Sequence, residues 1–397
     1  MRDLTMQPWP FAYATAGGPI VLRAPVGLYL IPSLIGKIGG FHAAEQALLV
    51  QDALLLGLIF ALGSVLFDTG HSRLLALAFF LGFSGMDVIG QWMVGQPLTL
   101  HLESWGTMQY SSHVTQAFWV PQHAMAGWIF AATYLLWREG RVPVAVPLAV
   151  LWLMALFSPL ALIGSVPFGL HALIMGWRRK ELSLPVCGAL ALVVLACSPS
   201  LLYLSAASGA VGAGEAHSAF RGYPSFILIE VGSFLVALWL VRKAPPFGRM
   251  TAALVAAVLL LAPFGQIGRN GDFTMRSSIP ALAILSLMMA RVVLEQHGRR
   301  EYIDARRWIM VAWVIGLATP AGEIWRGLTW PAAPEVLCGY VGVVPGGFAT
   351  YTAPLATMPA PVRPAHPNMV QEGSAHPCWL PAWRDPISGQ WTLVHPY

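Results

Sequence analysis

The sequence contains little charge: Asp, Glu, Lys and Arg make up 10% of its 397 residues, whereas hydrophobic residues make up 56%. A water-soluble domain with so few charges could not remain dispersed, so the composition excludes an ordinary soluble globular protein. Apolar segments long enough for a bilayer recur along the chain, separated by short loops. The sequence therefore predicts a polytopic α-helical protein whose first partner is the lipid bilayer.

Cysteine is also scarce, with four residues in the chain. They lack the paired spacing of zinc ligands, so no metal site is predicted from them. Cys187 and Cys197 lie inside one apolar segment and are interpreted as small packing residues. Cys338 and Cys378 lie in the C-terminal tail, where an oxidising compartment would permit a disulfide without requiring one.

The Lys and Arg residues are concentrated in alternate loops, which predicts that these loops lie on the cytoplasmic side. The net charge of +5 follows mostly from this bias and gives no support to nucleic-acid binding. The loops contain Arg73; Arg138 and Arg141; Arg178, Arg179 and Lys180; Arg242, Lys243 and Arg249; and Arg291, Arg299, Arg300, Arg306 and Arg307.

The alternation predicts an all-α bundle with about ten transmembrane helices. Prolines interrupt the region 143–176, which fits either two tilted spans or one broken hairpin. The expected spans are 46–67, 74–94, 116–136, two short ones within 143–176, 184–205, 224–241, 250–264, 279–295 and 308–323.

Three parts are predicted along the chain: an external segment 1–45, a transmembrane bundle 46–325, and an external, Pro-rich tail 326–397 that is extended and partly disordered. Residues 25–39 are short and rich in Gly and Pro, which favours an interfacial or re-entrant helix. This topology places Met1 outside without a segment to carry it across, so we expect an additional helix upstream of it.

The densest polar stretch runs from Gln91 to His123, where one expected helix leaves the membrane and the next enters it. Aromatic rings stack on sugar faces, amides and imidazoles bind hydroxyls, and a carboxylate can accept a proton. The mixture predicts a site for a sugar or a lipid headgroup, although interfacial aromatic residues are also common for membrane anchoring alone. The binding candidates are His101, His113, Trp119 and His123.

Carboxylates in or near this stretch are the candidate catalytic groups. Glu103 is close to His101 and could form an acid/base pair with it. Asp87 lies inside an expected span, where an ionisable residue requires a partner or a function. The same holds for Asp52 and Glu230.

A second external cluster precedes the span that begins near Ser278. A helix start and arginine side chains attract anions, so Arg276 and Arg269 predict a phosphate or pyrophosphate subsite, to which Arg221 of another external loop adds a contact. Asp272 is a further candidate catalytic carboxylate. Alternatively, Asp272 pairs with a neighbouring arginine and fixes the loop.

Three stretches together resemble bacterial polytopic membrane proteins of the GT-C glycosyltransferase type. They are LRAPVGLYLIPSLIGKIGGFHAAEQALL at 22–49, YSSHVTQAFWVPQHAMAGW at 110–128 and GDFTMRSSIPAL at 271–282. The resemblance covers about residues 1–325 and implies a GT-C-like bundle in the inner membrane, with an extracytoplasmic C-terminal tail. It implies transfer of a sugar from a polyprenyl-phosphate donor to an acceptor at the outer face.

In such proteins a carboxylate of the first external loop commonly serves as base or metal ligand, so a divalent cation is the cofactor that the resemblance would imply. Here Asp3 is the only acid before Glu45, which departs from that pattern.

The residues and the resemblance converge on one hypothesis, in which Glu103 or Asp87 is the base and Arg276, with Arg269 or Arg221, holds the donor phosphate. Two other classes remain open. A multi-pass transporter or lipid-linked-sugar flippase would line a path with Asp52, Asp87 and Glu230. A non-catalytic membrane subunit is the third class.

Overall fold

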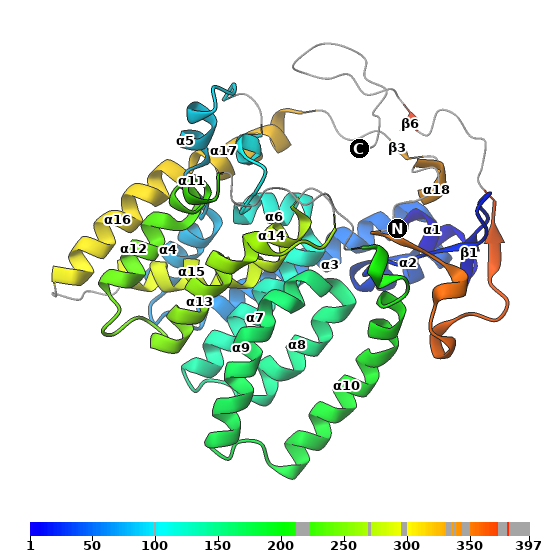
Figure 1. Cartoon of the computed structure of the whole chain (residues 1–397), viewed down its shortest axis with the longest axis horizontal. Coiled ribbons are helices and arrows are strands. Elements are labelled where there is room, and N and C mark those ends of the chain that lie inside the picture. Colours follow the sequence, from blue (N-terminus) through cyan, green and yellow to red (C-terminus); the bar gives the residue numbers. More distant parts are fainter. Residues whose placement is uncertain are drawn as a thin grey trace. The chain divides into compact units, whose positions relative to one another are not determined.

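The computed structural model describes residues 1–98, 101–211, 222–268, 271–294, 300–330, 335–336, 338–343, 350–371 and 379–380. This part of the chain is mostly helical (Figure 1). It divides into two compact units. The smaller comprises Met1–Gln51, Ser198–Ala213 and Arg326–Tyr397, and the larger comprises Asp52–Cys197 and Gly214–Trp325.

The larger unit is a helical bundle around α15 (Ile279–Leu294), which is buried along most of its length. This helix packs against α4 (Gly70–Leu81), α7 (Pro121–Arg138), α9 (Pro159–Arg178) and α13 (Arg249–Leu261). Long helices α3 (Phe41–Ser64), α10 (Leu184–Leu204) and α17 (Ala318–Thr329) run across the boundary of the units. The other helices of this unit are α4 (Gly70–Leu81), α5 (Asp87–Met93), η1 (Leu102–Trp105), α6 (His113–Trp119), α7 (Pro121–Arg138), α8 (Ala145–Phe157), α9 (Pro159–Arg178), α11 (Tyr223–Ile227), the π-helical η3 (Leu228–Gly232), α12 (Ser233–Leu240), α13 (Arg249–Leu261), η4 (Ala262–Phe264), α14 (Asp272–Ser277), α15 (Ile279–Leu294) and α16 (Arg300–Gly316).

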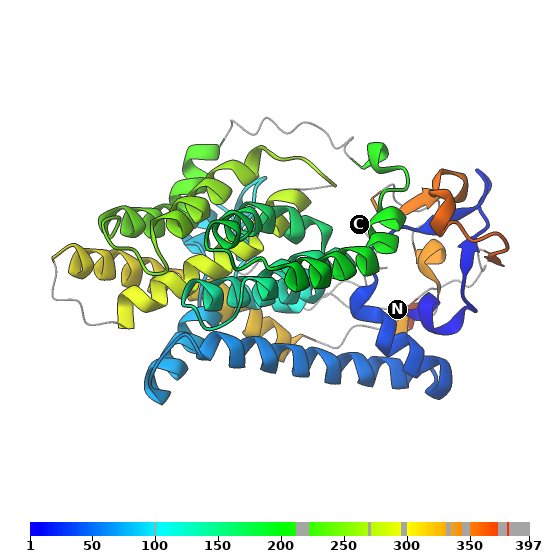
Figure 2. The same cartoon turned by 90° about the horizontal axis from the view of Figure 1, so that it is seen from below.

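Among the described residues, five helical segments are long and apolar enough to cross a membrane. The first of them, α3, is one unbroken helix (Figure 2). The prediction of a mostly helical protein with helices that could span a membrane is confirmed, and the number of ten spans stays a prediction. The five segments are Phe41–Ser64, Pro159–Arg178, Leu184–Leu204, Tyr223–Leu240 and Arg300–Thr329.

The expected spans 74–94 and 308–323 are not continuous helices, because the chain breaks where it touches other helices closely. A Cβ atom at Gly85, between α4 and α5, would lie 2.2 Å from Glu230 Oε2. A Cβ atom at Gly316, at the end of α16, would lie 2.9 Å from the carbonyl oxygens of Ser84 and Gly85. The Met86 amide also donates to the carbonyl of Ile229 in the π-helical turn (3.1 Å). Two breaks and one π turn therefore meet at one place in the bundle.

The region 143–176 forms two helices, α8 and α9, in contact with each other. Ser158 separates them, and its hydroxyl accepts the amide hydrogen of Ala161 (3.1 Å) as an N-terminal cap of α9. The region thus contains two distinct helices, of which α9 is long and apolar enough to cross a membrane, and the choice between two tilted spans and a broken hairpin stays a prediction.

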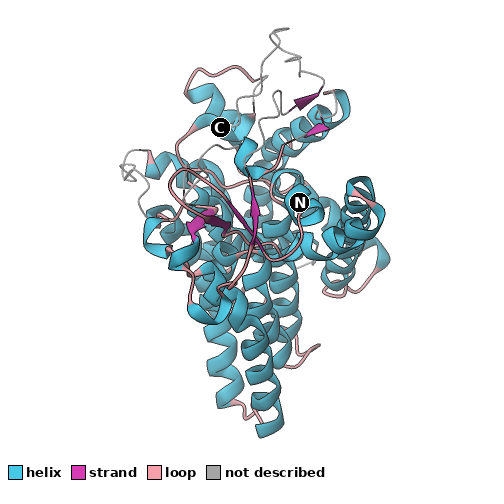
Figure 3. Cartoon of the chain, turned by 90° about the vertical axis from the view of Figure 1, so that its right-hand side faces the viewer, coloured by secondary structure: helices cyan, strands magenta, loops and turns pink. Residues whose placement is uncertain are grey.

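The smaller unit contains β-structure, so the purely α-helical fold class was wrong for this part of the chain (Figure 3). A four-stranded sheet has the order β4-β2-β1-β5, with β1 parallel to β5 and the other neighbours antiparallel. The helices and strands of the smaller unit are α1 (Arg2–Met6), β1 (Phe11–Tyr13), β2 (Ile20–Leu22), α2 (Gly27–Gly39), η2 (Ser208–Ala210), β3 (Glu335–Val336), α18 (Tyr340–Val343), β4 (Thr352–Pro354), η5 (Leu355–Thr357), η6 (Ala360–Val362), β5 (Asn368–Val370) and β6 (Trp379–Leu380). Strand β6 pairs with β3.

The tail segment 350–371, expected to be extended, is held by the N-terminal segment through this sheet. Asp3 accepts hydrogen bonds from the Tyr13 hydroxyl (2.6 Å) and the Tyr340 amide (2.7 Å). The N-terminal helix α1 is therefore bonded to the start of α18 in the tail. The expected helix in 25–39 is α2. Cys338 is disulfide-bonded and Cys187 and Cys197 are free, whereas Cys378 lies outside the described residues.

Candidate functional site

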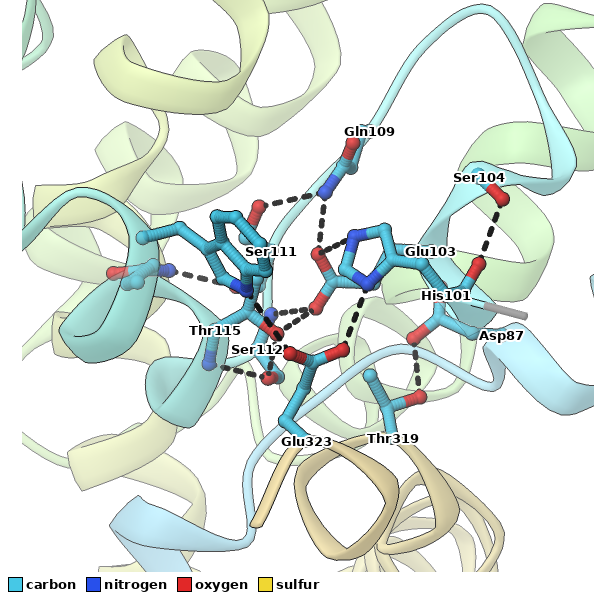
Figure 4. A network of polar contacts seen from close by, with 12 residues as sticks. Asp87, His101, Glu103, Ser104, Gln109, Ser111, Ser112, Thr115, Thr319 and Glu323 are labelled. Atoms are coloured by element: carbon cyan, nitrogen blue, oxygen red, sulfur yellow. Dashed lines mark hydrogen bonds and ion pairs between the residues drawn. The ribbon is translucent and has the colours of Figure 1, made fainter. Parts of the chain in front are cut away.

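The connection between α5 and α6 forms the densest polar cluster of the larger unit (Figure 4). Its centre is Glu103, whose side chain is completely buried. The carboxylate accepts hydrogen bonds from the Ser112 amide (2.8 Å) and the Thr115 hydroxyl (2.6 Å), and a further one from the Gln109 amide group. Ser112 caps α6 through the Thr115 amide, so the start of this helix supplies the donors that hold Glu103.

Burial raises the pKa of Glu103 to about 7, because a buried carboxylate loses the hydration of its charge. The negative charge of Asp87 acts in the same direction, while His101 and the hydrogen bonds from Thr115 and Ser112 partly oppose the rise. Glu103 can therefore exchange a proton near neutral pH.

His101 lies between two carboxylates. Its Nδ1 is 2.7 Å from Glu323 Oε1 and its Nε2 is 3.6 Å from Glu103 Oε2. Both acids are buried, but 28% of the His101 side chain is exposed. Figure 4 shows the imidazole directed between the two acidic groups. Such a pair of contacts fixes the orientation of the ring.

Trp119 completes this arrangement. Its indole N–H donates to Glu323 Oε2 (3.0 Å), and its ring centre is 6.5 Å from that of His101. More than half of the Trp119 side chain is exposed. Glu323 thus positions an imidazole and an exposed aromatic face side by side. We call His101, Glu103, Trp119 and Glu323 the His101 cluster.

Two further buried acids form a pair behind this cluster. Asp87, at the start of α5, accepts hydrogen bonds from the hydroxyls of Ser84 (2.9 Å) and Thr319 (2.8 Å). The indole N–H of Trp105 lies between the acids, 3.3 Å from Asp87 Oδ1 and 3.1 Å from Glu230 Oε1. We call Asp87 and Glu230 the carboxyl pair.

The predicted phosphate subsite is only partly described. Arg269 and Arg221 lie outside the described residues. Arg276 forms an ion pair with Asp272 (2.7 Å) within α14, in which each side chain is 13% exposed. Asp272 is therefore engaged in the loop-fixing contact that was the alternative to a catalytic role. The Arg276 Nε–H, however, is buried and has no acceptor among the described residues.

The two predicted histidine ligands near Trp119 are buried, so neither is placed to contact a substrate at the surface. His113 packs among Phe80, Phe83 and Trp128, and its Nδ1 bonds the Phe80 carbonyl (2.7 Å). Burial lowers its pKa to about 3, which makes it a neutral core residue. His123 bonds the Ser158 hydroxyl (2.6 Å) and is 7% exposed.

Sequence reasoning missed Glu323, and it placed Trp105 in the polar stretch without its contact to the two acids. A signal for Glu323 was present, because it is an acid at the end of an expected span and such residues require a partner. Trp105 is an aromatic residue in a polar loop, and nothing in its neighbours predicts that it bridges two carboxylates.

The described residues include no group of three or more His, Cys, Asp or Glu side chains arranged to hold a metal ion. No family model, no curated protein and no solved structure matches this chain.

Proposed function

We propose that the chain is a GT-C-type membrane glycosyltransferase with about ten spans in the bacterial inner membrane and an extracytoplasmic C-terminal tail. It transfers a sugar from a polyprenyl-phosphate donor to an acceptor hydroxyl at the extracytoplasmic face. The observation that supports this most is the His101 cluster, in which a partly exposed imidazole is held by buried carboxylates beside an exposed indole.

In this proposal His101 is the general base, because it is the partly exposed ionisable group of the cluster. Nδ1–H donates to Glu323, and Nε2, which lies 3.6 Å from Glu103 Oε2, would take the proton of the acceptor hydroxyl. The acceptor oxygen bonds to the anomeric carbon as the bond from that carbon to the phosphate oxygen breaks. Glu103 and Asp87, the bases expected from the sequence, are fully buried, and Glu103 would act on His101 through its charge, 3.6 Å from Nε2.

The donor sugar would stack on Trp119, since the apolar face of a sugar binds well to an aromatic ring. The phosphate would be bound by Arg276, whose buried Nε–H lacks an acceptor. The start of α14, the helix that contains Arg276, adjoins the α5–α6 connection, because a Cβ atom at Gly271 would lie 3.5 Å from the Thr107 carbonyl.

The test is transfer of radiolabelled sugar from a panel of polyprenyl-phosphate donors by membranes that contain the chain. His101→Gln should lower transfer by about 100-fold or more, the usual contribution of a general base. His71→Gln, at an exposed histidine of the same unit, is the matched control and should keep wild-type transfer. Equal transfer by both variants, at equal amounts of folded protein, would refute the assignment.

A proton-coupled transporter or lipid-linked-sugar flippase is the second candidate, favoured by the carboxyl pair inside the helical bundle. Reconstituted vesicles distinguish the two candidates. A transporter would move an intact lipid-linked or free sugar without breaking the bond to phosphate, whereas a transferase would release polyprenyl phosphate. A non-catalytic subunit would do neither.

A further inference from the structure

Glu230 is a buried acid with few hydrogen-bond donors around it. Its side chain is 1% exposed, and no described residue donates a hydrogen bond to Oε2. Among the described residues, Oε1 accepts the N–H of Trp105 alone, and this N–H is shared with Asp87. By contrast, Asp87 also accepts hydrogen bonds from two hydroxyl groups.

Among the described residues, the titratable groups that act on Glu230 carry no positive charge. The titratable side chains that act on it are Asp87 from α5, Glu103 from η1 and Tyr110 from the loop before α6, all of them acids. Neither member of the carboxyl pair forms an ion pair with any described residue. The carboxyl groups of Asp87 and Glu230 are neighbours, because Asp87 Oδ1 and Glu230 Oε1 lie 3.3 Å and 3.1 Å from the same Trp105 indole nitrogen.

Two adjacent carboxylates cannot both be ionised in such a place. Burying one unpaired charge costs several kcal/mol, and a second like charge in contact adds to this cost. A proton removes one charge and supplies the missing hydrogen bond between the two groups. Asp87, with its hydroxyl donors, is the better site for the remaining charge.

We propose that Asp87 and Glu230 form a proton-binding site in which Glu230 carries the proton and donates it to the Asp87 carboxylate at neutral pH. The ligand is a single proton, bound by the otherwise unsatisfied Oε2 of Glu230. This inference does not depend on the glycosyltransferase proposal.

The position of the site means that binding or loss of the proton affects the packing of several helices. Glu230 lies in the π turn, and π turns frequently mark functional positions in helices. Gly85, in the break between α4 and α5, packs on Glu230, and Asp87 begins α5 directly after that break. Thr319 of α17 binds the same carboxylate. Loss of the proton would therefore introduce repulsion where several helices meet.

The test is the infrared carbonyl stretch of a protonated carboxyl, measured on the purified full chain in detergent at about pH 8, well above the ordinary pKa of Glu. The band should be present in the wild type and lost in Glu230→Gln. The band should persist in Glu103→Gln. This variant is the control, because burial raises the pKa of Glu103, which lies outside the carboxyl pair.

A second variant keeps the test decisive if Glu230→Gln does not fold. Asp87→Asn removes the neighbouring charge but leaves burial to keep Glu230 protonated, so the band should remain, shifted by its new partner. A wild type without the band at about pH 8, or a band unchanged in Glu230→Gln, would overturn the proposal.

Discussion

At the level of single residues, the candidate site depends on acids that are buried and accept hydrogen bonds from neighbouring groups. Glu103 has donors on both oxygens, whereas Glu230 has one shared donor. The sequence identified Glu103, Asp87 and His101 because polar residues were dense there. It could not identify their partners, because Thr319 and Glu323 come from the other end of the chain.

The raised pKa of Glu103 predicts a pH dependence of stability. The pKa rises from 4.5 to about 7 on folding, so between these values the folded state holds a proton that the unfolded state has released. The contribution of Glu103 to the free energy of unfolding is then largest below the ordinary pKa of Glu. It is lost as the pH rises through about 7, by a total on the order of 3 kcal/mol.

Thermal unfolding in detergent, followed from about pH 5 to about pH 8, measures this effect. The midpoint should fall across the range in the wild type, and the slope should be smaller in Glu103→Gln. A Glu103→Gln protein with the full wild-type slope would show that another group is responsible.

At the level of secondary-structure elements, hydropathy predicted where helices lie but not where they break. The expected span 74–94 ends as a helix at Leu81 and resumes at Asp87. The cause is the contact of Gly85 with Glu230, two residues far apart in sequence. The strands of the smaller unit were missed for a related reason, because three-residue strands show no alternating pattern.

Gly85→Ala tests the close contact between the α4–α5 break and the π turn. The new methyl group would meet both the carboxyl group of Glu230 (2.2 Å) and its Cα atom (2.9 Å). We expect a loss of about 2 kcal/mol or more in the free energy of unfolding, the usual cost of overpacking a core.

Gly57→Ala in α3 is the matched control, because nothing lies within 4 Å of a Cβ atom there. It should leave stability unchanged or raise it by up to about 1 kcal/mol through helix propensity. Thermal unfolding of both variants in the same detergent compares them directly. Equal stability of the two variants would contradict the packing described here.

At the level of the whole molecule, composition predicted a helical membrane protein, and the described helices agree. The smaller unit combines segments from both ends of the chain with Ser198–Ala213, which composition along the sequence cannot reveal. Orientation rests on the placement of Lys and Arg residues, so the external position of the α5–α6 connection stays a prediction.

The most direct test of the central claim is transfer of radiolabelled sugar in sealed vesicles of known orientation that contain the chain and a polyprenyl-phosphate donor. We predict that labelled acceptor and free polyprenyl phosphate form on the face that carries residues 101–111, and that His101→Gln abolishes both products. Absence of transfer across the donor panel, or product on the opposite face, would contradict a transferase acting through the His101 cluster.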